Sequence, residues 1–371
     1  MRILQIDKFF YNRGGSTRIF FETIDGLRAK GQEVAEFATQ DPRNKTSAFA
    51  RYFPPAAPEL ETALSKIDLF KAFKHRFFSG EVDRRLSALV SDFRPEVAHL
   101  HNAFGQASAS VFVTLNQLRV PIVLTLHDPF PLFPNPVEKL EAYYYRLRIW
   151  KNIRLFICPC EFLARKMVEA GFPKEKMRVI RNPFSLPAHC PPLGTKVLYS
   201  GILNLEKGIR NFMRAAQLSP NLQFVVAGEG PDEAWVNNFI KDNKLTNVEQ
   251  VGWLEGEALQ KVMNEAKVVV VPSVSYENCS FRILEALCLG RIVVASRRGG
   301  NPEMVKDGET GFLSRPDDPE DLARVIARAM SLSADDAGKI VERGRQLVLR
   351  DHNPDQYFRL LLAVYEEAMR H

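Results

Sequence analysis

The chain has few cysteines and no long apolar run. Its 371 residues include 5 cysteines, an odd number. This usage indicates reduced thiols rather than a disulfide scaffold. No apolar stretch approaches the roughly 18 residues that a membrane-spanning helix needs. We therefore expect a cytoplasmic protein whose fold depends on neither disulfides nor a membrane span.

The usual metal and dinucleotide patterns are also missing. Cys158 and Cys160 are separated by one residue, which fits neither a zinc spacing nor a redox pair, and no His/Cys cluster follows. Gly14 and Gly15 lack the third glycine of a dinucleotide fingerprint, which disfavours NAD. Paired glycines can still bring backbone N–H groups close to an oxyanion. We expect no metal and no cofactor.

The charge is uneven along the chain. Residues 1–185 hold 28 Lys+Arg against 19 Asp+Glu, whereas residues 186–371 hold 22 against 25. Two basic stretches of the first half, 73–78 and 143–151, are interleaved with aromatic residues. They predict either ordinary amphipathic helices or peripheral contact with the acidic cytoplasmic face of a membrane. Nucleic acid is disfavoured, because no nucleic-acid-binding motif accompanies the charge.

Short apolar segments alternate with helical patterns along both halves, which is typical of buried parallel strands in α/β domains. The expected strands are 2–6, 34–38, 97–100, 122–126, 155–158, 196–200, 221–227, 248–251, 268–271 and 292–295. Residues 138–152 are expected to form one helix. Four prolines within 181–195 predict a linker. We therefore predict two doubly wound, Rossmann-like domains facing each other across a cleft, 1–185 and 186–350, with a final helix at 351–371 that packs back toward the first domain.

Two glutamates stand eight positions apart around an expected strand-to-helix connection. Glu277 falls on the loop after the strand 268–271, and Glu285 falls in the first turns of a helix that begins near Ser280. Ligands of open α/β sheets bind at such strand ends, where helix amino termini attract anions. Because carboxylates accept hydrogen bonds from paired hydroxyls, this spacing favours a site for ribose and sugar, although a solvated charge pair has the same pattern.

Two further strand ends of the second half carry candidate residues. Lys207 follows the strand 196–200 and could offset the charge of a leaving diphosphate, although a surface lysine would look the same. Gly300 and Asn301 belong to a glycine-rich turn after the strand 292–295, which could pass close to the phosphates or the sugar.

Two histidines of the first half follow expected strands. His101 precedes Asn102, and His127 precedes Asp128. Residues at strand ends line the ligand-binding edge of a sheet, which favours a role in a site over a role in packing. A structural hydrogen bond between His127 and Asp128 is the alternative.

Taken together and in this order, the motifs resemble the retaining glycosyltransferases of glycosyltransferase family 4, which have the GT-B fold. The resemblance covers nearly the whole chain. The segments that carry it are 14–15, 127, 179–182, 206–208, 226–231, 277 with 285, 299–300 with 303, and 307–312.

The resemblance implies a role for each matching residue. Glu285 resembles the family residue that binds the ribose. Glu277 and His127 resemble the residues that contact the donor sugar, and Lys207 resembles a residue that binds the diphosphate. Further donor-site positions follow from the same match: Gly14, Gly15, Gly201, Gly252, Trp253, Cys279, Ser280, Phe281 and Arg282. His101, Asn102, Asp128, Gly300 and Asn301 are candidates for the acceptor side.

Two departures from the family pattern stand out. Most relatives have arginine after the glycine that Gly201 matches, whereas this chain has Ile202. Arg282 could replace that diphosphate contact. Cys279 and Ser280 stand where phenylalanine and glycine are usual. Because this arginine is missing, a non-catalytic subunit that binds a sugar nucleotide remains an alternative function. A GT-B epimerase or phosphorylase is a second alternative.

The resemblance implies transfer of a hexosyl group from a UDP or GDP sugar with retention of configuration and without a metal. A saccharide or lipid-linked acceptor of envelope polysaccharide, lipopolysaccharide or glycolipid synthesis is expected.

Overall fold

The computed structural model describes residues 1–56, 75–102, 108–127, 138–187 and 190–370. The chain divides into two compact units, Met1–Asn182 with Asp355–His371 and Pro183–Pro354. The boundary of the units thus falls at 182/183, three residues before the expected one. None of the described helices is both long and apolar enough to cross a membrane.

Unit 1 contains a six-stranded parallel sheet with the order β2-β1-β3-β4-β5-β6. Its strands are β1 (Arg2–Ile6), β2 (Glu33–Phe37), β3 (Val97–Leu100), β4 (Ile122–Thr125), β5 (Leu155–Cys158) and β6 (Met177–Val179). The strands run as short apolar segments because both faces of the sheet are buried. The order of the strands changes direction between β1 and β3.

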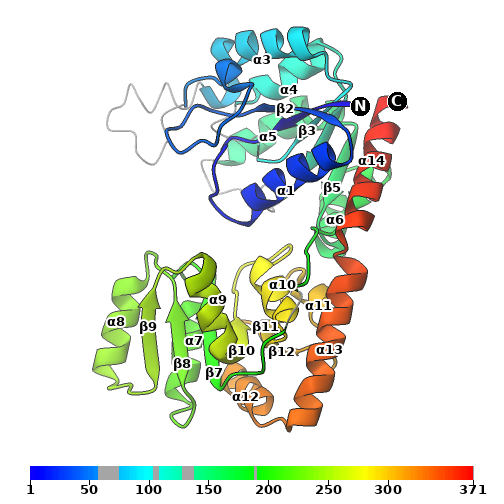
Figure 1. The fold of residues 1–371 in the computed structure, drawn as a ribbon. Coiled ribbons are helices and arrows are strands. Elements are labelled where there is room, and N and C mark those ends of the chain that lie inside the picture. The colour runs from blue at the N-terminus through cyan, green and yellow to red at the C-terminus, as the bar shows by residue number, and fades with distance from the viewer. Residues whose placement is uncertain (57–74, 103–107, 128–137, 188–189, 371) are drawn as a thin grey trace. The chain divides into compact units, whose positions relative to one another are not determined.

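Helices cover both faces of this sheet (Figure 1). They are α1 (Gly15–Ala29), α3 (Gly80–Phe93), α4 (Ser110–Gln117), α5 (Glu138–Arg148), α6 (Glu161–Glu169) and α14 (Pro354–Arg370), with short 3-10 turns at Ala50–Tyr52, Trp150–Asn152 and Lys174–Lys176. Alternate strand residues pack against α3 to α6 on one face and against α1 and α14 on the other. The last helix of the chain therefore belongs to the core of the first unit.

Unit 2 contains a second six-stranded parallel sheet, with the order β12-β11-β10-β7-β8-β9. Its strands are β7 (Lys196–Ser200), β8 (Phe224–Ala227), β9 (Val248–Gly252), β10 (Ala266–Val271), β11 (Ile292–Ser296) and β12 (Phe312–Ser314). From β7 the chain proceeds toward β9, and from β10 it proceeds toward β12. This reversal between β7 and β10 is the topological switch point of a Rossmann-type sheet.

The helices of unit 2 also lie on both faces of their sheet. They are α7 (Ile209–Gln217), α8 (Glu233–Asp242), α9 (Gly256–Glu265), α10 (Phe281–Cys288), α11 (Asn301–Met304), α12 (Pro319–Met330) and α13 (Ala334–Asp351). One face packs against α7, α8 and α12, and the other packs against α9, α10 and α11.

The two doubly wound sheets confirm the predicted fold class. All ten expected strands form, whereas β6 and β12 were missed, because each has three residues and lies at a sheet edge. The expected helix over 138–152 was wrong in length, since α5 ends at Arg148 and a 3-10 turn follows.

Candidate active site

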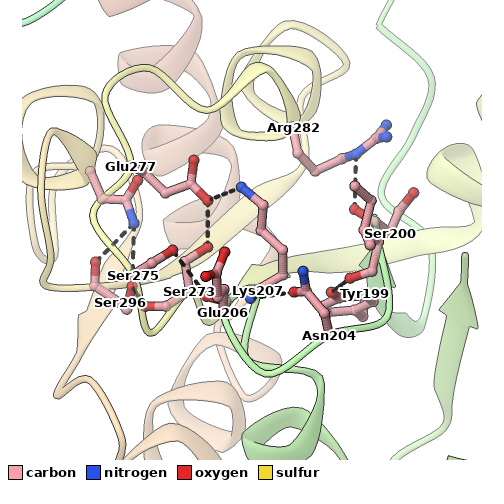
Figure 2. Close-up of polar contacts among 12 residues, drawn as sticks. Tyr199, Ser200, Asn204, Glu206, Lys207, Ser273, Ser275, Glu277, Arg282 and Ser296 are labelled. Carbon is pink, nitrogen blue, oxygen red and sulfur yellow. Dashed lines mark hydrogen bonds and ion pairs between the residues drawn. The ribbon is translucent and has the colours of Figure 1, made fainter. Parts of the chain in front are cut away.

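The first group of candidate residues lies at the carboxyl ends of β7 and β10. These strands are neighbours in the sheet and mark its switch point, where open α/β sheets hold ligands. Figure 2 shows Lys207, from the loop after β7, and Glu277, from the loop after β10, pointing toward each other. The fold thus brings together two residues that are 70 positions apart in the sequence.

Lys207 and Glu277 form an ion pair. The Lys207 Nζ lies 2.7 Å from the Glu277 Oε1, and the Ser273 hydroxyl donates to the same oxygen at 2.7 Å. The side chain of Glu277 is 13% exposed and that of Lys207 is 40% exposed. The Asn204 side chain accepts the backbone N–H of Lys207 at 2.8 Å and fixes this loop. The pair therefore has an anchored carboxylate and an ammonium open to an incoming anion.

Close packing of two loops produces this pair. Gly208 has a φ of 75°, and a Cβ there would lie 2.0 Å from the carbonyl oxygen of Pro272. Only glycine permits that approach. The carbonyl of Glu206 also accepts the backbone N–H groups of Val274 and Ser275, at 2.8 and 3.1 Å. These backbone contacts join the loop after β7 to the loop after β10.

The glycine-rich turn after β11 supports Glu277 from its backbone side. The Gly300 N–H donates to the Glu277 carbonyl at 2.6 Å, and a Cβ on Gly299 would lie 2.3 Å from that oxygen. Asn301 is fully buried and its amide donates to the Ser296 carbonyl at 3.1 Å. The turn thus holds the Glu277 loop in place, and Asn301 lies beneath that turn.

The start of α10 lies beside the ion pair. Cys279 and Ser280 lead into the helix, which begins at Phe281, and no side-chain cap accepts the first N–H groups. The Cys279 sulfur lies 3.9 Å from the Met304 sulfur, and the Phe281 ring lies 6.3 Å from that of Phe184. The Ile283 N–H donates to the Ser280 carbonyl at 3.1 Å. The start of the helix carries the partial positive charge that attracts anions.

Arg282 and Glu285 form a second ion pair on the first turns of α10. The Arg282 Nη1 lies 2.6 Å from the Glu285 Oε2, and its Nε donates to the Ser200 carbonyl at 3.2 Å. Ser200 ends β7 and directly precedes Gly201 and Ile202. The guanidinium therefore reaches the strand end where the family arginine is missing, and Ile202 there is 47% exposed.

Gly252 and Trp253 stand at the end of β9, two strands from β7. The Gly252 carbonyl accepts the Gly228 N–H at 2.7 Å. The Trp253 indole is 48% exposed and donates to the Glu255 Oε1 at 3.0 Å. The ring thus presents an apolar surface at the same edge of the sheet as Lys207.

The second group of candidate residues lies in unit 1, after the neighbouring strands β3 and β4. The His101 Nδ1 lies 2.8 Å from the His127 Nε2. Burial lowers the pKa of His127 to about 4 and that of His101 well below its ordinary value. Both rings are therefore neutral at neutral pH. Asp128, the other candidate beside His127, lies outside the described residues.

A buried carboxyl group lies near the histidines. The Asn102 amide donates to the Asp7 Oδ2 at 3.2 Å, and the Phe9 N–H donates to the Asp7 Oδ1 at 3.0 Å. Burial raises the pKa of Asp7 to about 7. Sequence reasoning missed this group, although its position directly after β1 is the same signal that identified His101 and His127.

The turn at Gly14 and Gly15 begins α1, but its N–H groups are not all available to a ligand. The N–H groups of Arg13 and Gly14 donate to the Thr17 hydroxyl at 2.9 and 3.2 Å. The Gly14 N–H therefore already has a partner, and the donor-site role of Gly14 and Gly15 stays a prediction. Within the described residues, no group of three or more His, Cys, Asp or Glu side chains could hold a metal ion.

The buried histidines make the stability of the protein sensitive to acid. In the unfolded chain a histidine gains a proton below about pH 6.5, whereas His99, His101 and His127 stay neutral in the fold because burial lowers each pKa. Each histidine therefore lowers the free energy of unfolding by up to about 1.4 kcal/mol for each pH unit below pH 6.5. Asp7 has the opposite sign, since its raised pKa keeps it protonated between about pH 4 and 7 while the unfolded chain ionises.

We expect the melting temperature of the protein to decrease when the pH is lowered from 7 to 5. The three histidines destabilise the fold over this interval by more than the one carboxyl group stabilises it. Thermal unfolding of the wild type and of Asp7→Asn tests this expectation. The variant should lose more stability over the same pH interval, since the opposing contribution is gone. An equal or smaller loss in Asp7→Asn would contradict the raised pKa of Asp7.

Comparisons with known proteins cover both units. Residues 13–186 match the model of Glycosyltransferase Family 4, and residues 193–347 match the model of Glycosyl transferases group 1.

Two relatives come from bacterial polysaccharide synthesis. The chain is 25% identical to the putative colanic acid biosynthesis glycosyltransferase WcaL of Escherichia coli, over 71% of this chain and 69% of that protein. It is 24% identical to the amylovoran biosynthesis glycosyltransferase AmsK of Erwinia amylovora, over 76% of this chain and 72% of that protein. Three further relatives are matched over 50% to 64% of their own length.

Among solved structures, the fold is similar to that of HepE from Anabaena in complex with UDP and glucose. The TM-score is 0.76 at 17% identity, and the match covers 99% of both chains. At this identity the similarity concerns the fold.

Proposed function

Because the chain belongs to the glycosyltransferases of the family 4 type with the GT-B fold, we propose that it transfers a hexosyl group from a nucleotide diphosphate sugar to a hydroxyl acceptor with retention of configuration. The observation that carries this proposal is the Lys207–Glu277 pair at the switch point of unit 2, beside the start of α10. HepE was solved with UDP and glucose, which supports a uridine nucleotide as the first donor to test.

A bound donor would separate Lys207 from Glu277. The diphosphate of the donor would form an ion pair with the Lys207 ammonium, which is the more exposed member of the pair. Glu277, held by Ser273, would then accept hydrogen bonds from sugar hydroxyls. Glu285 would bind the ribose, and the half-exposed Trp253 lies where the base is expected.

The leaving diphosphate would be stabilised by fixed positive groups. Lys207, Arg282 and the partial positive charge at the start of α10 are proposed to meet the charge that develops as the glycosidic bond breaks, without a metal ion. His127 of unit 1 is proposed to contact the sugar. Arrangements of this kind act because their charges are in place before the reaction begins.

Product analysis tests the proposed reaction. Purified protein is incubated with UDP-, GDP- and ADP-sugars and an extract of envelope saccharides, and the new linkage is assigned by NMR. Transfer with the anomeric configuration of the donor supports the proposal. Transfer with inversion, or sugar released as epimer or sugar phosphate, would contradict it.

Ile202 favours one alternative function, that of a sugar-nucleotide-binding subunit without catalysis. An exposed isoleucine stands where the resemblance to the family implies a diphosphate-binding arginine. Such a subunit would bind the donor yet show neither transfer nor slow donor hydrolysis, and Glu277→Ala would leave its cellular role intact. Donor hydrolysis without acceptor separates the two functions.

Arg282 is expected to take the place of the missing arginine. Arg282→Ala should weaken donor binding about tenfold or more, as expected for loss of a charged hydrogen bond. Isothermal titration with the donor that product analysis identifies measures this change in affinity. Ile202→Arg should restore binding in the Arg282→Ala background. Unchanged affinity in Arg282→Ala, with affinity abolished in Lys207→Ala, would exclude this role.

We propose an envelope polysaccharide or glycolipid acceptor, since WcaL and AmsK are glycosyltransferases of colanic acid and amylovoran synthesis. Unit 1 also carries an exposed aromatic-basic surface, which supports a peripheral position on the cytoplasmic face of the membrane. Phe78, Tyr143 and Leu147 are 62%, 61% and 52% exposed. The Phe77 and Tyr144 rings lie 5.2 Å apart, so the two stretches meet. Basic residues accompany them at positions 76, 146, 148 and 151.

Vesicle sedimentation measures this contact. We expect binding to vesicles with acidic headgroups and none to neutral vesicles, because basic side chains attract the former. Leu147→Ser should lower the bound fraction about tenfold at limiting lipid, since an inserted leucine loses its burial. Leu349→Ser, on a leucine of unit 2 that is 45% exposed, is the control. Equal effects of both substitutions would contradict the proposed contact of this surface with the membrane.

A further inference from the structure

A pocket of about 670 Å³ lies at one edge of the sheet of unit 1, where β4, β5 and β6 begin. Pro121, Arg154 and Lys176 line it, and each directly precedes one of these three strands. Because the strands are parallel, His101 and His127 stand at the opposite edge, after β3 and β4. Pockets of this size commonly hold small molecules. The pocket is therefore separate from the candidate site residues of unit 1.

The lining of this pocket is mainly basic. Its charged side chains are two carboxylates and five cations, and the cations are Arg119, Lys151, Arg154, Lys176 and Arg178. One carboxylate, that of Glu367, is paired with Arg178, whose Nε donates to its Oε2 at 3.1 Å. The other four cations form no ion pair with any residue that the structure describes, and the second carboxylate of the lining is that of Glu175. The pocket thus has an excess of positive charge that an anion would balance.

Lys176 is held in place by backbone groups. Its Nζ donates to the carbonyl oxygens of Lys151 and Ile153 at 3.1 and 2.8 Å. Burial lowers the pKa of this ammonium, repulsion from Arg154 lowers the pKa further, and Glu175 opposes the shift. An ammonium has three donors, so one N–H of Lys176 is left without a partner among the described residues. An anion held between Lys176 and Arg154 would therefore be attracted by both cations and would relieve their repulsion.

We propose that this pocket is a second ligand site of the protein and binds a phosphomonoester group, which is carried either by a soluble compound or by a lipid headgroup. Such a group has about two negative charges near neutral pH and three acceptor oxygens. Arg119 and Arg154 can each offer it two parallel hydrogen bonds, and Lys176 adds a third positive charge. The site does not depend on the proposed transfer reaction, since none of the residues of the proposed donor site lines it.

Thermal unfolding with increasing inorganic phosphate tests the soluble form of the ligand. The protein for this test carries Lys207→Ala, so that phosphate binding at the proposed donor site is weakened. Sodium chloride at the same ionic strength is the reference. We expect phosphate to raise the melting temperature above the reference, since a ligand of the folded state stabilises it. Arg119→Gly and Arg154→Gln should each raise the half-saturating phosphate concentration about tenfold, as expected for loss of a charged hydrogen bond.

Arg94→Gly is the matched control for Arg119→Gly. Both arginines are exposed, and each follows a helix of unit 1 in the left-handed conformation, with a φ of 52° for Arg94 and 58° for Arg119. Glycine adopts this conformation without strain, so neither substitution should hinder folding. Arg94 does not line the pocket. The two variants lose the same charge, and a difference between them therefore reports on the pocket and not on net charge or stability.

Vesicle sedimentation tests the lipid form of the ligand. Vesicles of phosphatidylcholine with phosphatidic acid present a phosphomonoester, and vesicles with phosphatidylserine present a different acidic headgroup. A bound fraction that falls about tenfold in Arg119→Gly but not in Arg94→Gly, with phosphatidic acid alone, assigns the phosphate to a headgroup. A stabilisation by inorganic phosphate that is weakened in Arg119→Gly but not in Arg94→Gly assigns it to a soluble compound. If neither measurement separates these two variants, the proposal is overturned.

Discussion

Replacing Lys207 by alanine is expected to lower kcat for transfer by about 10²- to 10³-fold, the loss typical of removing one preorganised group that stabilises developing charge. The Lys207 ammonium lies 2.7 Å from Glu277 at the switch point of unit 2 and is the cation best placed to meet a leaving diphosphate. Steady-state kinetics with the identified donor measure the effect. The loss of stability should be small beside the loss of kcat, because Lys207 is 40% exposed and Glu277 keeps the hydrogen bond from Ser273.

Lys196→Ala is the control for this substitution. Lys196 stands at the opposite end of β7 and pairs with Glu265 at 3.0 Å and with Glu249 at 3.4 Å. Its loss removes a lysine ion pair from the same strand without touching the proposed site. A kcat for Lys207→Ala within about threefold of that for Lys196→Ala would contradict the role of Lys207.

Gly208→Ala is expected to lower the free energy of unfolding by about 3 kcal/mol and to weaken donor binding with it. The residue has a φ of 75°, and its new Cβ would lie 2.0 Å from the Pro272 carbonyl, a backbone atom that cannot move alone. Left-handed strain and the forced shift of the loop both contribute to the loss. The same shift would separate Lys207 from Glu277. Chemical denaturation and donor titration measure the two effects.

Gly338→Ala is a control of opposite sign. Gly338 lies within α13, and a Cβ there meets nothing within 4 Å. Alanine should therefore stabilise that helix by roughly 0.5–1 kcal/mol. If both substitutions destabilised equally, the contact between Gly208 and Pro272 would not be the cause.

Much of unit 2 could be predicted from the sequence, because local signals mark its site. Glu277 and Lys207 each follow a recognisable apolar strand, and the carboxyl ends of parallel strands meet at one edge of a sheet. Their direct ion pair could not be predicted. It depends on the packing of Gly208 against Pro272, a contact between loops that no periodicity encodes.

Unit 1 shows where sequence reasoning ends. His101 and His127 could be predicted from their strand ends, but the hydrogen bond between Gln5 and Tyr365 could not, since Tyr365 lies on a helix at the far end of the chain and has the pattern of a core residue. The edge strands β6 and β12 were missed for a related reason. Three residues are too few to establish a period, and only pairing with a neighbouring strand defines them.

The most direct test of the account is thermal unfolding of the wild type and of Glu285→Ala in the presence of UDP, GDP, ADP and their sugar conjugates. A ligand that binds only the folded state stabilises it by about 2.7 kcal/mol at 100 times its Kd. We predict that one nucleotide family raises the midpoint of the wild type and that Glu285→Ala loses this shift. Equal shifts in both proteins would place the nucleotide elsewhere, and no shift with any of these ligands would contradict a donor site at the switch point of unit 2.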